Sequence, residues 1–253
     1  MLYKTSIDES QLPEGYDLTG GKGGYPATEG FLTFGSSGLL YQSNKLMYDR
    51  NTDTLWHQMW GTPAFGPLVG SGIELERLPV TLTTWEAWYA EHPNTQVMDF
   101  DTGYVRDYRV GVAYAEYFDS QDTMFPVWQL NNALPTKSWV FTQLIDDQPK
   151  AYPLSVLEDE LVVNDTLAGQ DLVIIHEDGG HGARAYVRGE HTFSPASEDT
   201  TTVIKDETGE RWQVTEDALV SEDGEELSRL PGHMAYWFGW YQFYPQTLIY
   251  GQP

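Results

Sequence analysis

The sequence predicts a mainly β protein of the α+β class. We expect two tandem, pseudo-symmetric β-rich units, each with one short aromatic helix, joined by an ordered crossover. Short apolar and aromatic runs alternate with turn residues, and 24 glycines and 14 prolines are spaced so that long helices are excluded. One long run also occurs twice, which predicts a duplicated unit.

The repeated run is LERLPVTLTTWEAWYAEHPNTQVM at 75–98 and LSRLPGHMAYWFGWYQFYPQTLIY at 227–250, an offset of 152 residues. The matching residues are Leu75, Arg77, Leu78, Pro79, Trp85, Trp88, Pro93, Thr95 and Val97 against Leu227, Arg229, Leu230, Pro231, Trp237, Trp240, Pro245, Thr247 and Ile249. A looser match joins Thr33, Phe34, Thr52 and Trp56 to Thr192, Phe193, Thr208 and Trp212, with the offset drifting from 159 to 156. Such drift is expected when duplicated strands keep their pairing while their turns change length.

The repeat divides the chain into four parts. Residues 1–30 read as an irregular, glycine-rich leader, and residues 31–100 as the first, truncated β-rich repeat. Residues 101–144 read as an ordered connector packed on both halves, because they are aromatic and proline-punctuated rather than charged. Residues 145–253 form the second, more complete repeat.

In the first unit, strands alternate with turns from Phe31, and residues 49–54 are the expected hairpin tip. A short helix is expected in WEAWYAEHP, capped by Thr84 and ended by Pro93. A strand is expected at 95–100. In the second unit we expect a strand, a helical turn, and then strands in LVVNDT, DLVIIHE and ARAYVR, with DGGHG as the last hairpin turn.

Composition excludes several classes of function. With 38 acidic against 14 basic residues the net charge is −24, which argues against nucleic acid or anionic lipid as a partner. No run is long enough to span a membrane, and no signal peptide is visible after Met1. The absence of cysteine excludes disulfides and thiolate metal sites.

The segments FGSSGLLYQSNKLMYDRNTDTLWHQMWGTPAFGPLVG, MFPVWQLNNALPTKSWVF, KAYPLSVL and VVNDT give the chain a specific likeness. It resembles the prokaryotic family known as domain of unknown function 3179, from about Phe31 to Tyr250. The resemblance implies fold and lineage rather than an activity, since the family has none established. It also implies a cell-envelope or exported location, because relatives often carry export signals.

The chain departs from the family pattern in its first unit. Members resemble two tandem units, the first opening with its own AYPL and VND segments and a Cys-Pro-Leu-Cys-Gly-Thr motif suited to redox chemistry or soft metals. Here the second unit has 43 residues from Ala151 to Phe193, but only 33 positions precede Phe34, and they show no such pattern. The front segment and its cysteine motif are therefore missing, and we assign the redox site to no residue.

Two groups of residues are candidates for ligand contact. Tyr152, Asn164 and Asp165 lie in the segments that match the family motif and could line a pocket, although an Asx side chain at a strand end more often fixes a turn. Asp49 and Arg50 border the expected hairpin tip. An ion pair or a locked turn explains them as well as ligand binding does.

The densest set of possible metal ligands is HEDGGH, with His176, Glu177, Asp178 and His181. Histidine with carboxylates could hold zinc or another borderline metal. The two glycines between them make a plain hairpin turn the simpler interpretation.

These observations favour a non-catalytic or degenerate member of the family with a binding or structural role, no cofactor, and an unknown small molecule or protein as partner. The first alternative is a metal-binding protein or metalloenzyme that uses histidine and carboxylates. The second is carbohydrate binding on the nine tryptophans, although the repeated tryptophans have the spacing of a core. No pair of carboxylates stands out as an acid and a base.

Overall fold

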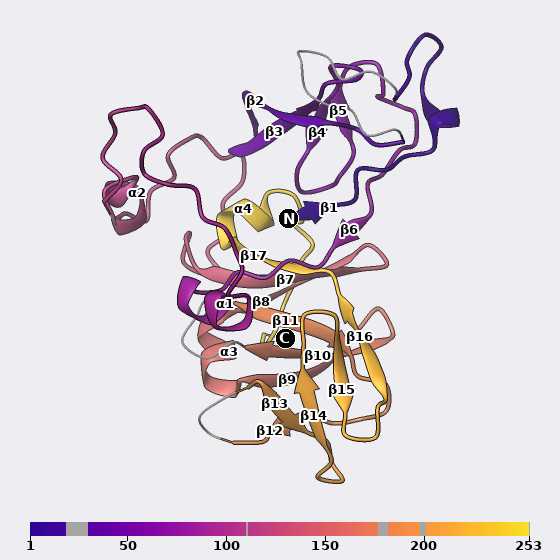
Figure 1. Ribbon diagram of the computed structural model, residues 1–253, viewed down its shortest axis with the longest axis vertical. Helices are drawn as coiled ribbons and strands as arrows, with labels where there is room; N and C mark the ends of the chain where they lie inside the picture. The colour runs from indigo at the N-terminus through magenta and orange to yellow at the C-terminus, as the bar shows by residue number, and fades with distance from the viewer. Residues whose placement is uncertain (19–29, 110, 177–181, 198–200, 253) are drawn as a thin grey trace.

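The computed structural model describes residues 1–18, 30–109, 111–176, 182–197 and 201–252 (Figure 1). These residues form many short strands, β1 to β18, and four short α-helices. The prediction of a β-rich α+β protein is confirmed.

The first sheet lies at one end of the molecule's long axis (Figure 1). Its four antiparallel strands are, in spatial order, β2 (Phe34–Tyr41), β3 (Asn44–Asp49), β4 (Leu55–His57) and β5 (Pro63–Phe65). The expected hairpin tip at 49–54 joins β3 to β4. Its core contains Leu18, Leu32, Trp56, Leu68, Ile73 and Leu75.

The largest sheet forms the other end of the molecule and has the order β12-β13-β14-β15-β16-β11-β10-β9 (Figure 1). Its strands are β9 (Val162–Leu167), β10 (Gln170–His176), β11 (Ala183–Val187), β12 (Ser194–Pro195), β13 (Val203–Lys205), β14 (Arg211–Val214), β15 (Ala218–Ser221) and β16 (Glu226–Leu230). The first three are strands that the sequence predicts. The turn predicted at DGGHG lies mostly outside the described residues.

A four-stranded sheet lies between these two, in the order β17-β7-β8-β18. Its strands are β7 (Trp139–Ile145), β8 (Gln148–Pro153), β17 (Gly232–Tyr236) and β18 (Leu248–Ile249). Helix α3 (Leu154–Glu160) follows β8 directly, and helix α4 (Trp237–Tyr241) follows β17 directly. Strand β17 is antiparallel to β7, whereas β18 is parallel to β8. The hairpin of β7 and β8 is thus enclosed by the two strands that flank α4.

The leader pairs with a later segment of the first half of the chain. Strand β1 (Leu2–Tyr3) pairs with β6 (Arg77–Leu78), and a 3-10 helix, η1, spans Glu9–Gln11. Leu18 is fully buried in the core of the first sheet.

Two short helices lie in the middle of the chain, α1 (Trp85–Glu91) and α2 (Ala115–Asp119). Helix α1 begins as predicted, because the Thr84 hydroxyl accepts a hydrogen bond from the amide of Ala87 at 3.2 Å. The strand predicted at 95–100 is wrong, since these residues form no strand. A strand is stable only beside a hydrogen-bonded neighbour, and none of the described strands pairs with them.

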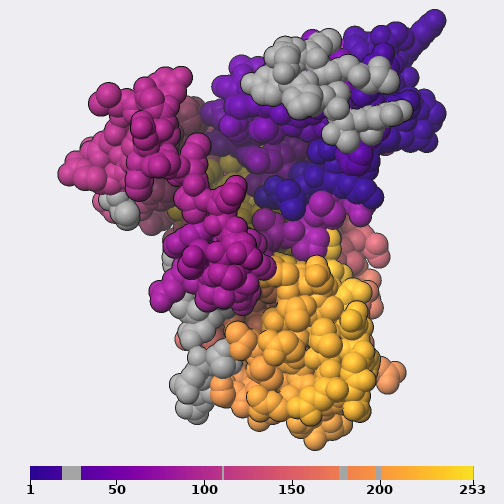
Figure 2. Space-filling view, viewed as in Figure 1, coloured from indigo at the N-terminus to yellow at the C-terminus, as the bar shows by residue number. Residues whose placement is uncertain are grey.

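The connector projects from the body as a lobe in Figure 2. Many of its large apolar side chains are exposed, namely Tyr104, Val105, Tyr114, Phe118 and Trp128. It contacts the region of α4 at two points: the Trp237 indole donates to the Asn131 carbonyl at 3.0 Å, and the Trp128 amide donates to Gln242 at 3.1 Å. Packing on both halves stays a prediction.

The strands that lead to Trp56 and Trp212 carry the same buried clamp. The Trp56 indole donates to a carboxylate oxygen of Asp49 at 2.8 Å, and the Trp212 indole donates to Asp206 at 3.2 Å. Phe34 meets the Trp56 ring edge-on at 5.5 Å and 74°, as Phe193 meets Trp212 at 5.4 Å and 82°. In this article an aspartate and tryptophan joined in this way are called an Asp–Trp clamp.

Helices α1 and α4 also share their contacts. The Trp88 indole donates to the Thr95 hydroxyl at 2.9 Å, and the Trp240 indole donates to the Thr247 hydroxyl at the same distance. The two helices differ in how deeply they are buried. Trp237 of α4 is 1% exposed, whereas Trp85 at the matching position of α1 is 52% exposed.

None of the helices in the described part of the chain has the length and apolar character needed to cross a membrane.

Candidate functional site

Tyr152 and Asp165, two of the residues predicted to line a pocket, lie side by side on β8 and β9. The Tyr152 hydroxyl donates to Asp165 at 2.7 Å, and Lys150 pairs with the same carboxylate oxygen at 2.6 Å. Tyr250 stacks on the Tyr152 ring at 5.4 Å. Burial, and then the hydrogen bond to Asp165, raise the pKa of Tyr152 above its ordinary value. The cluster is filled by its own side chains.

Asn164 points away from that cluster. Its amide group donates to the Phe193 carbonyl and accepts from the Phe193 amide, both at 2.8 Å. It therefore fastens β9 to the strand that follows the loop at 188–192, which is a structural role.

Replacing Tyr152 by phenylalanine should lower the free energy of unfolding by about 1–2 kcal/mol, because a largely buried hydrogen bond to a carboxylate is lost while Lys150 still neutralises Asp165. Urea unfolding measures the change. Tyr250→Phe is the matched control: it keeps the ring stack, removes only an exposed bond to Glu160, and should cost less than about 0.5 kcal/mol. Equal losses in the two variants would contradict this assignment.

Asp49 is fully buried and fixes a turn. It accepts from the Thr52 amide at 2.5 Å and from the Thr52 hydroxyl at 2.9 Å, besides the Trp56 indole. The Arg50 guanidinium lies over the Tyr48 ring at 5.2 Å. Asp49 thus has its oxygens turned into the protein, and ligand contact by Asp49 or Arg50 stays a prediction.

His176 is buried at the end of β10, and its Nδ1 lies 2.9 Å from the Gly182 carbonyl oxygen. A carbonyl oxygen only accepts, so Nδ1 carries the hydrogen and the other ring nitrogen is the one free to bind a metal. Glu177, Asp178 and His181 lie outside the described residues. A metal site in this turn remains a prediction.

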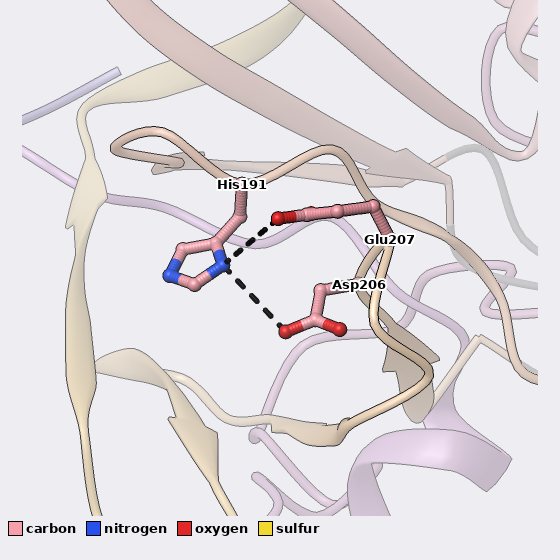
Figure 3. A group of neighbouring side chains, drawn as sticks. All are labelled: His191, Asp206 and Glu207. Atoms are coloured by element: carbon pink, nitrogen blue, oxygen red, sulfur yellow. Dashed lines mark ion pairs between the residues drawn. The ribbon is translucent and has the colours of Figure 1, made fainter.

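A different set of side chains meets in the geometry of a metal site, namely His191, Asp206 and Glu207 (Figure 3). One ligand atom from each lies within 4.8 Å of the others. His191 Nδ1 is 3.6 Å from Asp206 Oδ2 and 4.0 Å from Glu207 Oε1. Figure 3 shows both carboxylates directed at the same ring nitrogen.

Local structure fixes the two carboxylates. Asp206 and Glu207 lie in the tight turn between β13 and β14, closed by backbone bonds between Asp206 and Glu210 and between Gly209 and Asp206. Asp206 Oδ1 accepts from the Thr208 amide at 2.9 Å, from the Thr208 hydroxyl at 2.7 Å and from the Glu210 amide at 3.1 Å. Among the described residues, Oδ2 accepts a hydrogen bond only from the Trp212 indole, so it retains lone-pair capacity toward His191.

The two carboxylate oxygens of Glu207 also have different partners. Oε2 accepts from the Thr192 amide at 2.8 Å, while Oε1 faces His191. Burial opposes ionisation of Asp206, but hydrogen bonds from Thr208, Trp212 and Glu210 outweigh it and hold its pKa below the ordinary value. The bond from the Thr192 amide is the main cause that lowers the pKa of Glu207. Both groups are therefore anionic at neutral pH.

His191 is held at the end of the turn that follows β11. Its backbone is fixed by Arg188, whose guanidinium donates to the His191 carbonyl at 2.7 Å. Its ring packs edge-on against Trp212 at 5.0 Å. His191 Nδ1 is buried and has no hydrogen-bond partner among the described residues, and Nε2 lies 3.7 Å from Glu225.

The sequence offered little signal for this set, because strands β12 and β13 separate His191 from Asp206 and no local motif joins them. The predicted internal repeat offers one clue. In that alignment Leu32 stands at the place of His191, Arg50 at the place of Glu207 and Asp49 at the place of Asp206. An Asp–Trp clamp occurs in both sheets, whereas His191 and Glu207 have no counterpart of the same residue type in the predicted first unit.

A family model described as "Protein of unknown function (DUF3179)" matches residues 17–247. The chain belongs to this family. The match begins before Phe31, so the DUF3179 similarity includes part of the leader that the sequence resemblance had left out. No curated protein and no solved structure matches the chain. Membership in DUF3179 therefore brings no established activity, and function has to be argued from the site.

Proposed function

We propose that this DUF3179 protein is a non-catalytic binding protein that holds a divalent cation, Zn²⁺ or Mn²⁺, between His191, Asp206 and Glu207. The observation that carries the proposal is the position of His191 Nδ1. It is buried, has no hydrogen-bond partner among the described residues, and faces one oxygen from each of two carboxylates. These are Asp206 Oδ2, which also accepts the Trp212 indole, and Glu207 Oε1. Imidazole and carboxylate donors suit these metals.

Distance favours a cation over a simple ion pair. A charged imidazole hydrogen-bonded to a carboxylate has its nitrogen and oxygen about 2.7–3.2 Å apart. The gaps here are 3.6 and 4.0 Å, too long for such bonds. A metal about 2.0–2.2 Å from each ligand atom spans separations of roughly 3–4.4 Å. The opposite ring nitrogen lies 3.7 Å from Glu225, which is also too long for a direct hydrogen bond.

A binding role is favoured over catalysis because of how the carboxylates are held. A general base works best with a pKa near the operating pH. Asp206 and Glu207 instead have lowered pKa values and each spends one oxygen on backbone amides, which suits fixed ligands. The cation would fasten the loop at 188–192 to the turn between β13 and β14.

Zinc titration should show about one equivalent bound, with thermal stabilisation that grows with free zinc as mass action requires, about 2.7 kcal/mol at one hundred times Kd. His191→Ala and Glu207→Gln should each weaken binding at least tenfold. Glu210→Gln is the matched control. It changes an acidic side chain in the same turn that is not part of the His191, Asp206 and Glu207 group, keeps the backbone bond from Glu210 to Asp206, and should leave the affinity unchanged.

Two further outcomes decide between sites. The proposal is overturned if isothermal calorimetry shows that His191→Ala binds zinc as tightly as the native protein does. If His181→Ala alone abolishes binding, the metal belongs to the HEDGGH turn instead. Direct ion pairing of His191 without a metal predicts that zinc leaves the His191 imidazole resonances unmoved.

Carbohydrate binding is the second candidate, and one observation supports it. Trp56, Trp212, Trp237 and Trp240 are buried, which removes most of the repeated tryptophans as a sugar platform. Trp85 and Tyr89 remain, exposed and stacked at 5.4 Å and 29°. Binding to a glycan array that is lost in Trp85→Ala and kept in Trp128→Ala, another exposed tryptophan, would support this candidate.

A further inference from the structure

A small cavity lies where the two-stranded sheet of β1 and β6 meets the middle sheet. Its volume is about 10 Å³, and every residue that lines it belongs to the described part of the chain. Its walls include Arg77, Leu78, Thr142, Leu144, His233 and Trp240, from β6, β7, β17 and α4. A space of this size has room for about one water-sized particle, which excludes most organic ligands. We name it the Arg77 cavity.

The Arg77 guanidinium is held by uncharged groups. Its Nη2 donates to the Tyr244 hydroxyl at 3.2 Å, and Tyr3 lies opposite it in the pairing of β1 with β6. Burial is the main cause that raises the pKa of both tyrosines, so both hydroxyls stay protonated at neutral pH. Among the residues that the structure describes, Arg77 forms no ion pair with a carboxylate. The charge of Glu74 reaches both tyrosines, but its side chain is exposed to solvent, which screens it.

One nitrogen of Arg77 is also buried without an acceptor. Arg77 Nε has no hydrogen-bond partner among the described residues. Such donors are rare in folded proteins, because the bond to water is lost on burial and nothing replaces it. An acceptor inside the Arg77 cavity supplies the missing bond.

The predicted repeat offers a comparison for Arg77. Arg229 stands at its place in the second unit, and the Arg229 guanidinium forms an ion pair with Glu216. There a carboxylate of the protein neutralises the arginine. At Arg77 the same part falls to an anion from solution.

The field inside the cavity also favours an anion over a neutral water molecule. Burial is the main cause that lowers the pKa of His233, and the charge of Arg77 lowers it further, so the imidazole is neutral at neutral pH. The positive charge that opposes a proton on His233 attracts an anion. The net charge of −24 repels anions at long range, but physiological salt screens that repulsion beyond roughly 8 Å.

We propose that the Arg77 cavity binds a halide ion, normally chloride, which accepts a hydrogen bond from Arg77 Nε. Phosphate, sulfate and carboxylates are too large for a space of about 10 Å³. A halide is slightly larger than water, and small rotamer shifts of Leu78 and Leu144 admit it. The ion fastens β6 of the first half to β7 and β17 of the second half. The site shares no residue with the His191, Asp206 and Glu207 group, so it stands without the metal.

Thermal unfolding in sodium chloride, bromide or iodide tests the site, with sodium gluconate holding the ionic strength constant. We expect a saturable rise of about 2–4 °C in Tm with a millimolar midpoint. Chloride should act at lower concentration than iodide, because the cavity is small. Non-specific adsorption of anions gives the opposite order, since the weakly hydrated iodide adsorbs best. A rise that does not saturate, or that is largest with iodide, overturns the proposal.

Two variants of Arg77 separate its charge from its Nε–H group. Arg77→Met removes both and should abolish the dependence of Tm on chloride. Arg77→Lys keeps the charge but has no Nε–H, and it should bind chloride at least tenfold more weakly. Arg106→Met, at an exposed arginine of the connector, is the matched control and should respond to chloride as the native protein does. A native response in Arg77→Met contradicts the assignment.

Diffraction from native crystals grown in sodium bromide keeps the test decisive if the Arg77 variants fail to fold. Data collected at the bromine absorption edge should show an anomalous peak in the Arg77 cavity, within hydrogen-bonding distance of Arg77 Nε. Density there without anomalous signal means a water only and overturns the proposal. Anomalous peaks confined to the protein surface mean an adventitious ion only, with the same consequence.

Discussion

Replacing Asp49 by alanine is expected to lower the free energy of unfolding by about 3–5 kcal/mol. The carboxylate is fully buried and accepts from the Thr52 amide, the Thr52 hydroxyl and the Trp56 indole. Removing it leaves these donors unpaired in the core of the first sheet. Urea unfolding followed by tryptophan fluorescence measures the change.

Asp53→Asn is the control for Asp49→Ala. It lies in the same turn, is exposed, and has φ of 60°, a conformation that asparagine tolerates. It should change stability by less than about 0.5 kcal/mol. A loss below about 1 kcal/mol in Asp49→Ala would show that the Asp–Trp clamp does not hold the turn.

The second large effect is expected from pH and rests on His233 of β17. Thr142 lies 3.0 Å from its Nδ1, and the Trp240 ring lies 5.7 Å away. Burial, and then the positive charges of the Met1 amino group and Arg77, lower the pKa of His233 from 6.5 to about 3. The folded protein therefore keeps this histidine neutral over a range in which the unfolded chain protonates it.

The direction of the pH effect on stability follows from the difference between the folded and unfolded pKa of His233. Above pH 6.5 the contribution of His233 is fully present, and it is lost as the pH falls toward 3, because the unfolded chain then binds the extra proton. The loss through this one group should reach about 2–3 kcal/mol by pH 4.5. The measurement is urea unfolding of native protein and His233→Asn between pH 7.5 and 4.5. Parallel stability curves for the two proteins would contradict it.

The sequence was informative wherever a structural reason is local. Thr84 and Pro93 bound α1, and the turn residues at 49–54 placed the hairpin between β3 and β4. The strand expected at 95–100 failed for a non-local reason. Its sequence matches β18, but a strand also needs a neighbour, and the hairpin that β18 pairs with belongs to the second half only.

The candidate sites show the same limit. Tyr152 and Asp165 were paired by the sequence and do meet in space, yet Lys150 closes the cluster that they form. The sequence did not single out His191. The β13–β14 turn brings Asp206 and Glu207 close to it, and sequence spacing does not reveal that contact. Asp49 was predicted to be a turn residue or a ligand, and its burial and its bonds to Thr52, which the sequence does not reveal, support the turn.

The parallel pairing of β18 with β8 also bears on the order of assembly during synthesis. Strands β7 and β8 leave the ribosome long before β17 and β18, which complete the sheet on both sides. Until then the hairpin has two open edges and its apolar residues lack the aromatic helix that covers them. The nascent chain therefore keeps both edges of this hairpin unpaired until β17 and β18 are made, the interval in which a chaperone would be most useful.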